Sequence, residues 1–213
     1  QLGMARLEIK QQAFDKAAAR LSNVLSKNDG NVEAMIELAG VNRLMGQVAE
    51  AQRWLEKADD RSGTSTRAGL ELVALHLATG RADLGREAVK RLTSKAPEDH
   101  DVLMASARVA LAVGDKSEAK SILVRAAGLA GFDAARLVDV AILQRQAGQL
   151  ADASHSLDKA LSARPGFLPA TLVLADVDIR RGEYAKAEQL ARKVMADHPS
   201  LGVGHALMGD LAM

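Results

Sequence analysis

The sequence predicts an all-α protein built from repeated pairs of antiparallel helices, and three observations support this fold class. Glycine recurs with a constant period, at Gly46, Gly80, Gly114, Gly148 and Gly182. Five residues after each of these glycines stands a very small residue: Ala51, Gly85, Ala119, Ala153 and Ala187. At a third position of the repeat stand residues that end helices: Gly63, Pro97, Gly131, Pro165 and Pro199. A 34-residue period in several columns is typical of a solenoid of stacked supersecondary units.

The first helix of each unit, helix A, is expected to begin after a capping residue. One column holds four residues that favour the N-cap position, namely Asn31, Ser65, Asp99 and Asp133. Phe167 and Leu201 break this column in the last two copies. In the first full unit the pattern predicts helix A over residues 32–45.

The five recurring glycines are predicted to be structural turn residues with positive φ between the two helices of a unit. A polar residue follows each glycine and opens the second helix, helix B, which is predicted over residues 47–60 in the first full unit. Proline or glycine then ends helix B. The column of very small residues lets the two antiparallel helices approach closely, because a larger side chain there would overpack their contact.

The whole chain, 1–213, is predicted to be a single array of such units. The predicted boundaries are a partial repeat at 1–31, full repeats at 32–65, 66–99, 100–133, 134–167 and 168–201, and a partial repeat at 202–213. The array stops within a repeat at both ends and shows no polar capping helix. We therefore expect a piece of a longer array, whose exposed ends can also support self-association.

Composition excludes several classes of function. Hydrophobic residues make up 48% and charged residues 26% of the 213 residues, which is the balance of a globular chain. The formal net charge is +1 and aromatic residues are only 2%, so a nucleic-acid partner is not expected. There is no cysteine, and no apolar run has the length that direct membrane insertion requires.

No motif in the sequence predicts catalysis. The five histidines, His76, His100, His155, His198 and His205, show no metal-ligand spacing. Asp176 and Asp178 lie two residues apart in a predicted helix and therefore point in different directions. No nucleophile elbow or phosphate-binding loop is present. We expect no enzymatic activity, no cofactor and no metal.

The 34-residue pattern resembles the tetratricopeptide repeat (TPR). In the last full copy the matching positions are Leu174, Ala175, Asp178, Ala187, Ala191 and Pro199. Aliphatic residues replace most of the aromatic positions of that family. The resemblance implies a superhelical TPR-type α-solenoid with a concave groove lined by the A helices, and a non-catalytic scaffold that binds a protein or peptide partner there.

Charged residues at the groove positions that the resemblance implies form the candidate partner-binding set: Glu33, Arg43, Arg67, Arg108, Arg145, Asp176 and Arg180. Every unit contributes one arginine among apolar neighbours, a pattern that suits a peptide carrying acidic groups. The alternative is pairing within the array. Asp176 and Arg180 are four residues apart, and Glu37, Glu71 and Asp139 can neutralise other arginines across units.

The alanine-rich style of the repeats is also similar to TPR lipoproteins of bacterial exopolysaccharide and PEP-CTERM systems. This second resemblance implies a bacterial periplasmic or envelope location and a scaffold for exopolysaccharide assembly or export. The residues themselves leave the compartment open. Two alternatives remain: direct binding of an acidic polysaccharide, and a spacer or regulatory array attached to another domain.

Overall fold

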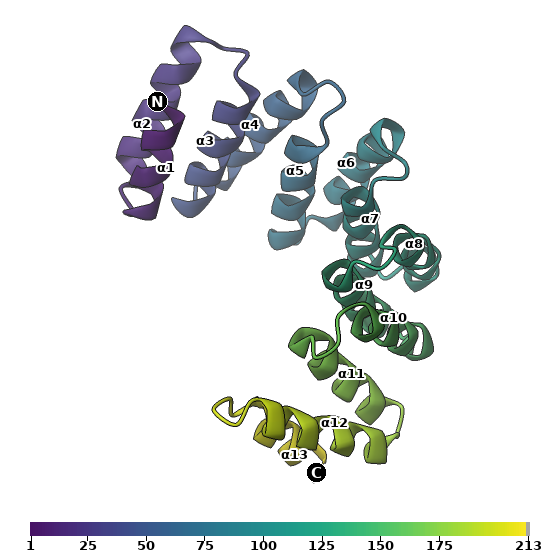
Figure 1. Ribbon diagram of the computed structural model, residues 1–213. Helices are drawn as coiled ribbons and strands as arrows, with labels where there is room; N and C mark the ends of the chain where they lie inside the picture. The colour runs from purple at the N-terminus through teal and green to yellow at the C-terminus, as the bar shows by residue number, and fades with distance from the viewer. Residues whose placement is uncertain (212–213) are drawn as a thin grey trace. The chain divides into compact units, whose positions relative to one another are not determined.

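The computed structural model describes residues 1–211, which form thirteen α-helices (Figure 1). Residues 212–213, at the end of the predicted last partial repeat, lie outside the described residues. The A helices are α1 (Leu2–Lys10), α3 (Val32–Leu44), α5 (Arg67–Ala78), α7 (His100–Ala112), α9 (Ala134–Gln146), α11 (Leu168–Arg180) and α13 (Val203–Leu211). The B helices are α2 (Phe14–Lys27), α4 (Val48–Arg61), α6 (Ala82–Lys95), α8 (Lys116–Leu129), α10 (Leu150–Ala163) and α12 (Tyr184–Asp197).

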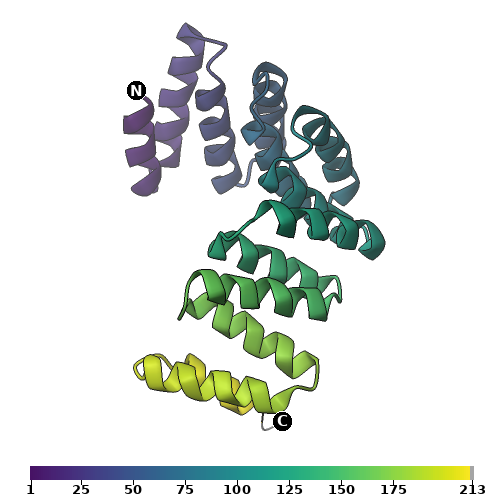
Figure 2. The same ribbon diagram turned by 45° about the vertical axis from the view of Figure 1, so that its right-hand side comes forward.

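The chain divides into two compact units, with the division inside α7. Unit 1 comprises Gln1–Ala105, and unit 2 comprises the described residues from Ser106 onward. Within unit 1, each helix from α1 to α5 packs against the next one along the chain. Within unit 2 the same holds from α8 to α12, and α9 also packs against α11 (Figure 2). Both units are therefore layered helix pairs, as the sequence predicted.

Three of the four helix boundaries in the repeat recur with the period of the turn glycines. The ends of successive A helices from α1 to α11 are spaced by one period, and the B helices begin and end with the same spacing. The A helices begin less regularly, since α5 begins at Arg67 and α13 at Val203. The predicted helices at 32–45 and 47–60 correspond to α3 and α4, each displaced by one residue at one or both ends.

The turn inside each repeat is a Schellman motif. At the end of α3 the Gly46 N–H donates to the Arg43 carbonyl at 3.1 Å, and the Gln47 N–H donates to the Asn42 carbonyl at 2.8 Å. The same two bonds recur at the other four turn glycines. All five have φ between 71° and 82°, so the predicted positive φ is confirmed. In the first partial repeat Gln12 takes the glycine's place, with φ 58°.

The predicted caps of the A helices are confirmed at three positions and wrong at one. The side chains of Asn31, Asp99 and Asp133 each accept a hydrogen bond from a backbone N–H in the first turn of the following helix. Ser65 does not cap α5. Its N–H and carbonyl both bond to Ser62, and Thr66 takes the cap position without a side-chain bond. This loop therefore delays the start of α5 by one residue.

The core is built largely from alanine and leucine at the recurring positions. The very small residues of the B helices are all buried: Ala17, Ala51, Gly85, Ala119, Ala153 and Ala187. Leu21, Leu123 and Leu157 fill another repeated position and are fully buried. The burial of every residue in this column agrees with the reason predicted for it, which is close contact between A and B helices.

Candidate partner-binding face

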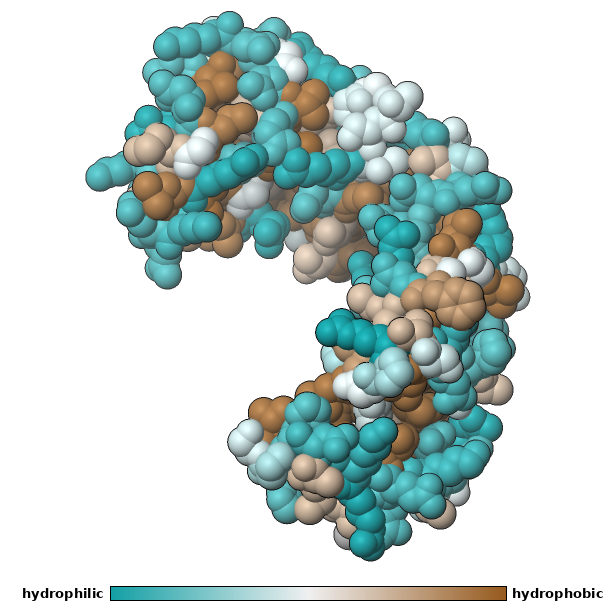
Figure 3. All heavy atoms as spheres, viewed as in Figure 1, coloured by the Kyte–Doolittle hydropathy of each residue, from teal (hydrophilic) through white to brown (hydrophobic). Residues whose placement is uncertain are grey.

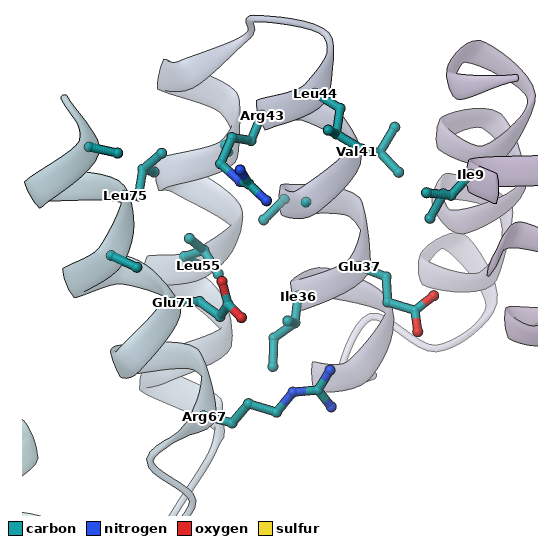
Figure 4. Close-up of a pocket in the computed structure, with 15 residues that line it drawn as sticks. Ile9, Ile36, Glu37, Val41, Arg43, Leu44, Leu55, Arg67, Glu71 and Leu75 are labelled. Atoms are coloured by element: carbon teal, nitrogen blue, oxygen red, sulfur yellow. The ribbon is translucent and has the colours of Figure 1, made fainter. Parts of the chain in front are cut away.

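The A-helix face of unit 1 contains a hollow with a cavity volume of about 460 Å³ (Figure 4). Helices α1, α3, α4 and α5 all contribute to its lining. Ile36, Leu55 and Leu75 supply large apolar side chains, and Gly40 and Ala74 supply small ones. The volume falls within the range of about 300–1,000 Å³ that is usual for ligand pockets.

Four charged residues line this hollow: Glu37, Arg43, Arg67 and Glu71. In Figure 4, Arg43 from α3 and Glu71 from α5 turn toward the space around Ile36. Glu37 lies on the side of α3 that faces α1. An apolar floor with charged groups at its edge is the usual composition of a specific binding pocket, because the charges orient a ligand and the apolar surface contributes affinity.

Two of these charged residues belong to a chain of ion pairs that crosses three A helices. Arg6 of α1 bonds to both Glu33 and Glu37 of α3, with a distance of 2.6 Å from Arg6 Nη2 to Glu33 Oε1. Arg67 of α5 bonds to the other oxygen of Glu33. The hydrogen bond to Glu37 is the main cause of a raised pKa at Arg6. These pairs fix the side chains that border the hollow.

The other two charged residues, Arg43 and Glu71, have no such partner. Among residues 1–211, neither side chain makes an ion pair or a hydrogen bond, and both are exposed. The predicted neutralisation of a groove arginine by Glu71 is therefore not formed in this structure. The predicted pairing of Glu37 is formed, but with Arg6 of the first partial repeat.

In unit 2 the structure brings three predicted residues together. Asp176 of α11 accepts hydrogen bonds from Arg145 of α9 and from Arg180 of its own helix, the latter at 3.0 Å. Burial alone would raise the pKa of Asp176, but the hydrogen bonds from Arg180 and Arg145 outweigh it and lower that pKa. The predicted i,i+4 pair is thus confirmed, and it is extended by a contact between neighbouring repeats. Arg108 of α7 is exposed and has no ion pair within the described part of the chain.

The five arginines of the predicted set do not share one position of the repeat. Arg43 and Arg145 are equivalent by the 34-residue period, whereas Arg67, Arg108 and Arg180 occupy three other positions. From the sequence they were predicted to form one set along the groove, with one arginine in each unit. The structure places Arg43 and Arg67 at one hollow in unit 1, with Glu33 ion-paired to Arg67. Arg145, Asp176 and Arg180 form one ion-paired cluster in unit 2.

Sequence reasoning missed Arg6, Gly40 and Ala74 as parts of this face. It also missed a column of buried polar residues four places before the turn glycine, at Asn42, His76, Gln144 and Asp178, with Glu8 as its first member. Gln144 accepts a hydrogen bond from Ser156 at 2.8 Å, and Glu8 forms a two-bond ion pair with Arg20. The signal available in the sequence was the polar character of this column, which only Ala110 breaks between positions 8 and 178.

Within residues 1–211 no group of three or more histidine and carboxylate side chains is placed to hold a metal ion. None of the helices in the same range combines the length and apolar character that a membrane span requires.

Fold and face together define a class: a helix-pair repeat protein whose A helices present charged and apolar side chains for contact with another molecule. A family model described as tetratricopeptide repeat matches residues 8–62, 42–109 and 144–211. The chain therefore belongs to the tetratricopeptide repeat family, whose members generally act as non-catalytic scaffolds for protein partners. A search of curated proteins finds no match.

Solved structures with the same fold agree with this assignment. The chain is similar to PilW, described as a widely conserved type IV pilus biogenesis factor, with a TM-score of 0.75, 16% identity, and coverage of 97% of this chain and 96% of that one. It is similar to pilF of Pseudomonas aeruginosa, with a TM-score of 0.68, 13% identity, and coverage of 98% and 95%. YrrB, described as a TPR protein with an unusual peptide-binding site, gives a TM-score of 0.60, 15% identity, and coverage of 89% and 98%.

Proposed function

We propose that this chain is a scaffold that binds an extended segment of a partner protein across the A-helix face of unit 1. The observation that carries the proposal is the hollow between α3 and α5, where Arg43 and Glu71 stand beside an apolar floor without partners among residues 1–211. Unpaired opposite charges at either side of an apolar surface suit a peptide, which offers both a carboxylate and hydrogen-bond donors.

The surface of unit 1 supports recognition by mixed contacts. In Figure 3 its hydrophobic side chains form separate small areas bordered by hydrophilic ones. An interface of this kind gains affinity from apolar contacts and specificity from placed charges. The ion-paired cluster of Arg145, Asp176 and Arg180 in unit 2 has its charges already satisfied by one another. We therefore assign the binding role to unit 1 and a structural role to that cluster.

Random dodecapeptides displayed on phage test this proposal. Peptides selected on the wild-type chain are expected to bind Arg43→Glu at least tenfold more weakly. The reason is that the new side chain repels the peptide carboxylate that Arg43 attracts. Lys90→Glu is the matched control, since Lys90 is exposed on B helix α6 and its substitution makes the same change in charge. Circular dichroism must show that both variants keep their helical content.

Three results would count against the proposal. They are no enriched peptide, equal binding to Arg43→Glu and wild type, and equal losses in Arg43→Glu and Lys90→Glu. Polygalacturonate serves as a probe for the alternative predicted from the sequence, direct binding of an acidic polysaccharide. Binding of polygalacturonate that Arg43→Glu abolishes, with no peptide enriched, would favour that alternative. A setting in exopolysaccharide assembly or export stays a prediction from the sequence.

A further inference from the structure

The hollow in unit 1 exists because one position of the A helix carries unusually small residues in two neighbouring repeats. By the 34-residue period, Gly40 and Ala74 are equivalent to each other and to larger residues in other repeats: Arg6, Arg108, Ile142 and Asp176. Gly40 and Ala74 lie on adjacent A helices, α3 and α5, and both line the hollow. The missing side-chain volume at these two positions is therefore the space that a ligand can occupy.

Neither the backbone nor the packing requires glycine at position 40. Its φ does not fall in the left-handed region, and a Cβ built there would meet no atom within 4 Å. By contrast, a Cβ at Gly69 of α5 would stand 2.7 Å from Leu92 Cδ2. Glycine inside a helix costs about 0.5–1 kcal/mol relative to alanine. Gly40 thus lowers helix stability and leaves open space at the floor of the hollow.

We infer that the hollow is a specificity pocket for one large apolar side chain of the bound peptide. The inference rests on the proposed function, which requires only that a peptide binds this face. It adds that the peptide carries leucine, isoleucine, methionine or phenylalanine at one fixed position. The side chain enters over Gly40 and Ala74, and Arg43 contacts a carboxylate farther along the same peptide.

The test compares peptides selected on the wild-type chain with variants that fill the hollow. Gly40→Leu should weaken peptide binding at least tenfold and leave the protein folded, because its Cβ meets open space. Gly128→Leu is the matched control, since Gly128 is an exposed glycine inside helix α8 of unit 2 whose Cβ would also meet nothing within 4 Å. The selected peptides should share one large apolar residue, and its replacement by alanine should cost at least tenfold in Kd.

Peptides that bind Gly40→Leu as tightly as wild type but lose affinity for Arg43→Glu would overturn the inference and leave the proposed function standing. Peptides that bind all variants equally, or the absence of any enriched peptide, would overturn both.

Discussion

Two glycines of neighbouring A helices show how one residue type can have opposite consequences. A Cβ added to Gly40 of α3 would meet open space. A Cβ added to Gly69 of α5 would lie 2.7 Å from Leu92 Cδ2 and 3.1 Å from Asp59 Oδ1. Leu92 is fully buried, so its methyl group has little room to move. Asp59 is held by Lys95 at 2.8 Å. Gly69 is therefore required by packing, and Gly40 is not.

Alanine substitution at these two glycines should change stability in opposite directions. Gly40→Ala should raise the free energy of unfolding by about 0.5–1 kcal/mol through improved helix propensity. Gly69→Ala gains the same propensity but overpacks the contact at a cost of about 1–3 kcal/mol, so it should be destabilising. Urea unfolding followed by circular dichroism measures both. Equal shifts of the same sign in the two variants would contradict the geometry.

His76 of α5 gives the chain a pH-dependent stability. The residue is 3% exposed, and its Nδ1 lacks a hydrogen-bond partner among the described residues. Burial, followed by the charge of Arg81, lowers the pKa of His76 below its ordinary value of 6.5. A lowered pKa means that the unfolded chain takes up a proton before the folded chain does as pH falls. Stability attributable to His76 is therefore present above pH 6.5 and declines below it.

Replacing His76 by glutamine should remove this dependence, because Gln144 occupies the equivalent buried position of a later repeat. Between pH 7 and pH 5 the wild-type chain should lose more unfolding free energy than His76→Gln, by at most about 1.4 kcal/mol per pH unit below 6.5. Urea unfolding at several pH values measures the difference. Parallel pH profiles for the two proteins would show that His76 does not titrate differently in the folded and unfolded states.

At the scale of the helix, boundaries are set by turns and caps more than by propensity. The Schellman turn recurs with the same two hydrogen bonds even where Gln12 replaces glycine. N-caps vary more. Asp133 accepts hydrogen bonds from the N–H groups of Ala135 and Arg136, whereas Gln47 caps α4 without a side-chain bond. A helix end can therefore keep its place in the repeat while its capping energy differs from copy to copy.

The cap of α9 should contribute measurably to stability. Asp133→Ala removes the acceptor for two backbone N–H groups and should lower the free energy of unfolding by about 1 kcal/mol. Gln47→Ala is the matched control and should change it little, because the Gln47 side chain makes no cap bond. Thermal unfolding followed by circular dichroism compares the two. A larger loss in Gln47→Ala would mean that the side-chain cap is not what stabilises these helix starts.

The sequence was sufficient to predict the helices, their order and the turn glycines, because each depends on residues that recur with the period. Ser65 was wrongly predicted as a cap because the path of its loop depends on the bond to Ser62, which no column reveals. The hollow was missed for a related reason. It arises from side chains that are absent at Gly40 and Ala74, and a search for charged residues does not detect missing volume. The ion pairs of Glu33 were not predicted either, because they depend on which A helices lie side by side.

At the scale of the whole molecule, stability is divided among neighbouring helices. The packing observed in each unit joins helices that are adjacent or nearly adjacent along the chain. In such arrays stability is approximately a sum of repeat and nearest-neighbour terms, so local damage stays local. The Gly69 contact, which involves α5, α6 and Asp59 of α4, should therefore influence unit 1 more than distant helices.

Hydrogen exchange should show this locality directly. In Gly69→Ala the amides of α4, α5 and α6 should exchange faster than in wild type, while those of α11 and α12 should keep their protection. Mass spectrometry of peptic fragments after deuterium labelling measures each region. A uniform loss of protection from α2 to α12 would instead mean that the described chain unfolds as one cooperative body.

The buried polar column makes two helix pairs chemically distinct from each other. Between α1 and α2 the site holds the ion pair of Glu8 and Arg20, and between α9 and α10 the equivalent site holds the hydrogen bond of Gln144 and Ser156. An A helix that docked on the B helix of another repeat would bury Glu8 against a serine or Gln144 against an arginine. These two helix pairs thus differ in their buried polar contacts although their backbones are alike. We expect this difference to favour docking of each A helix on its own B helix during folding.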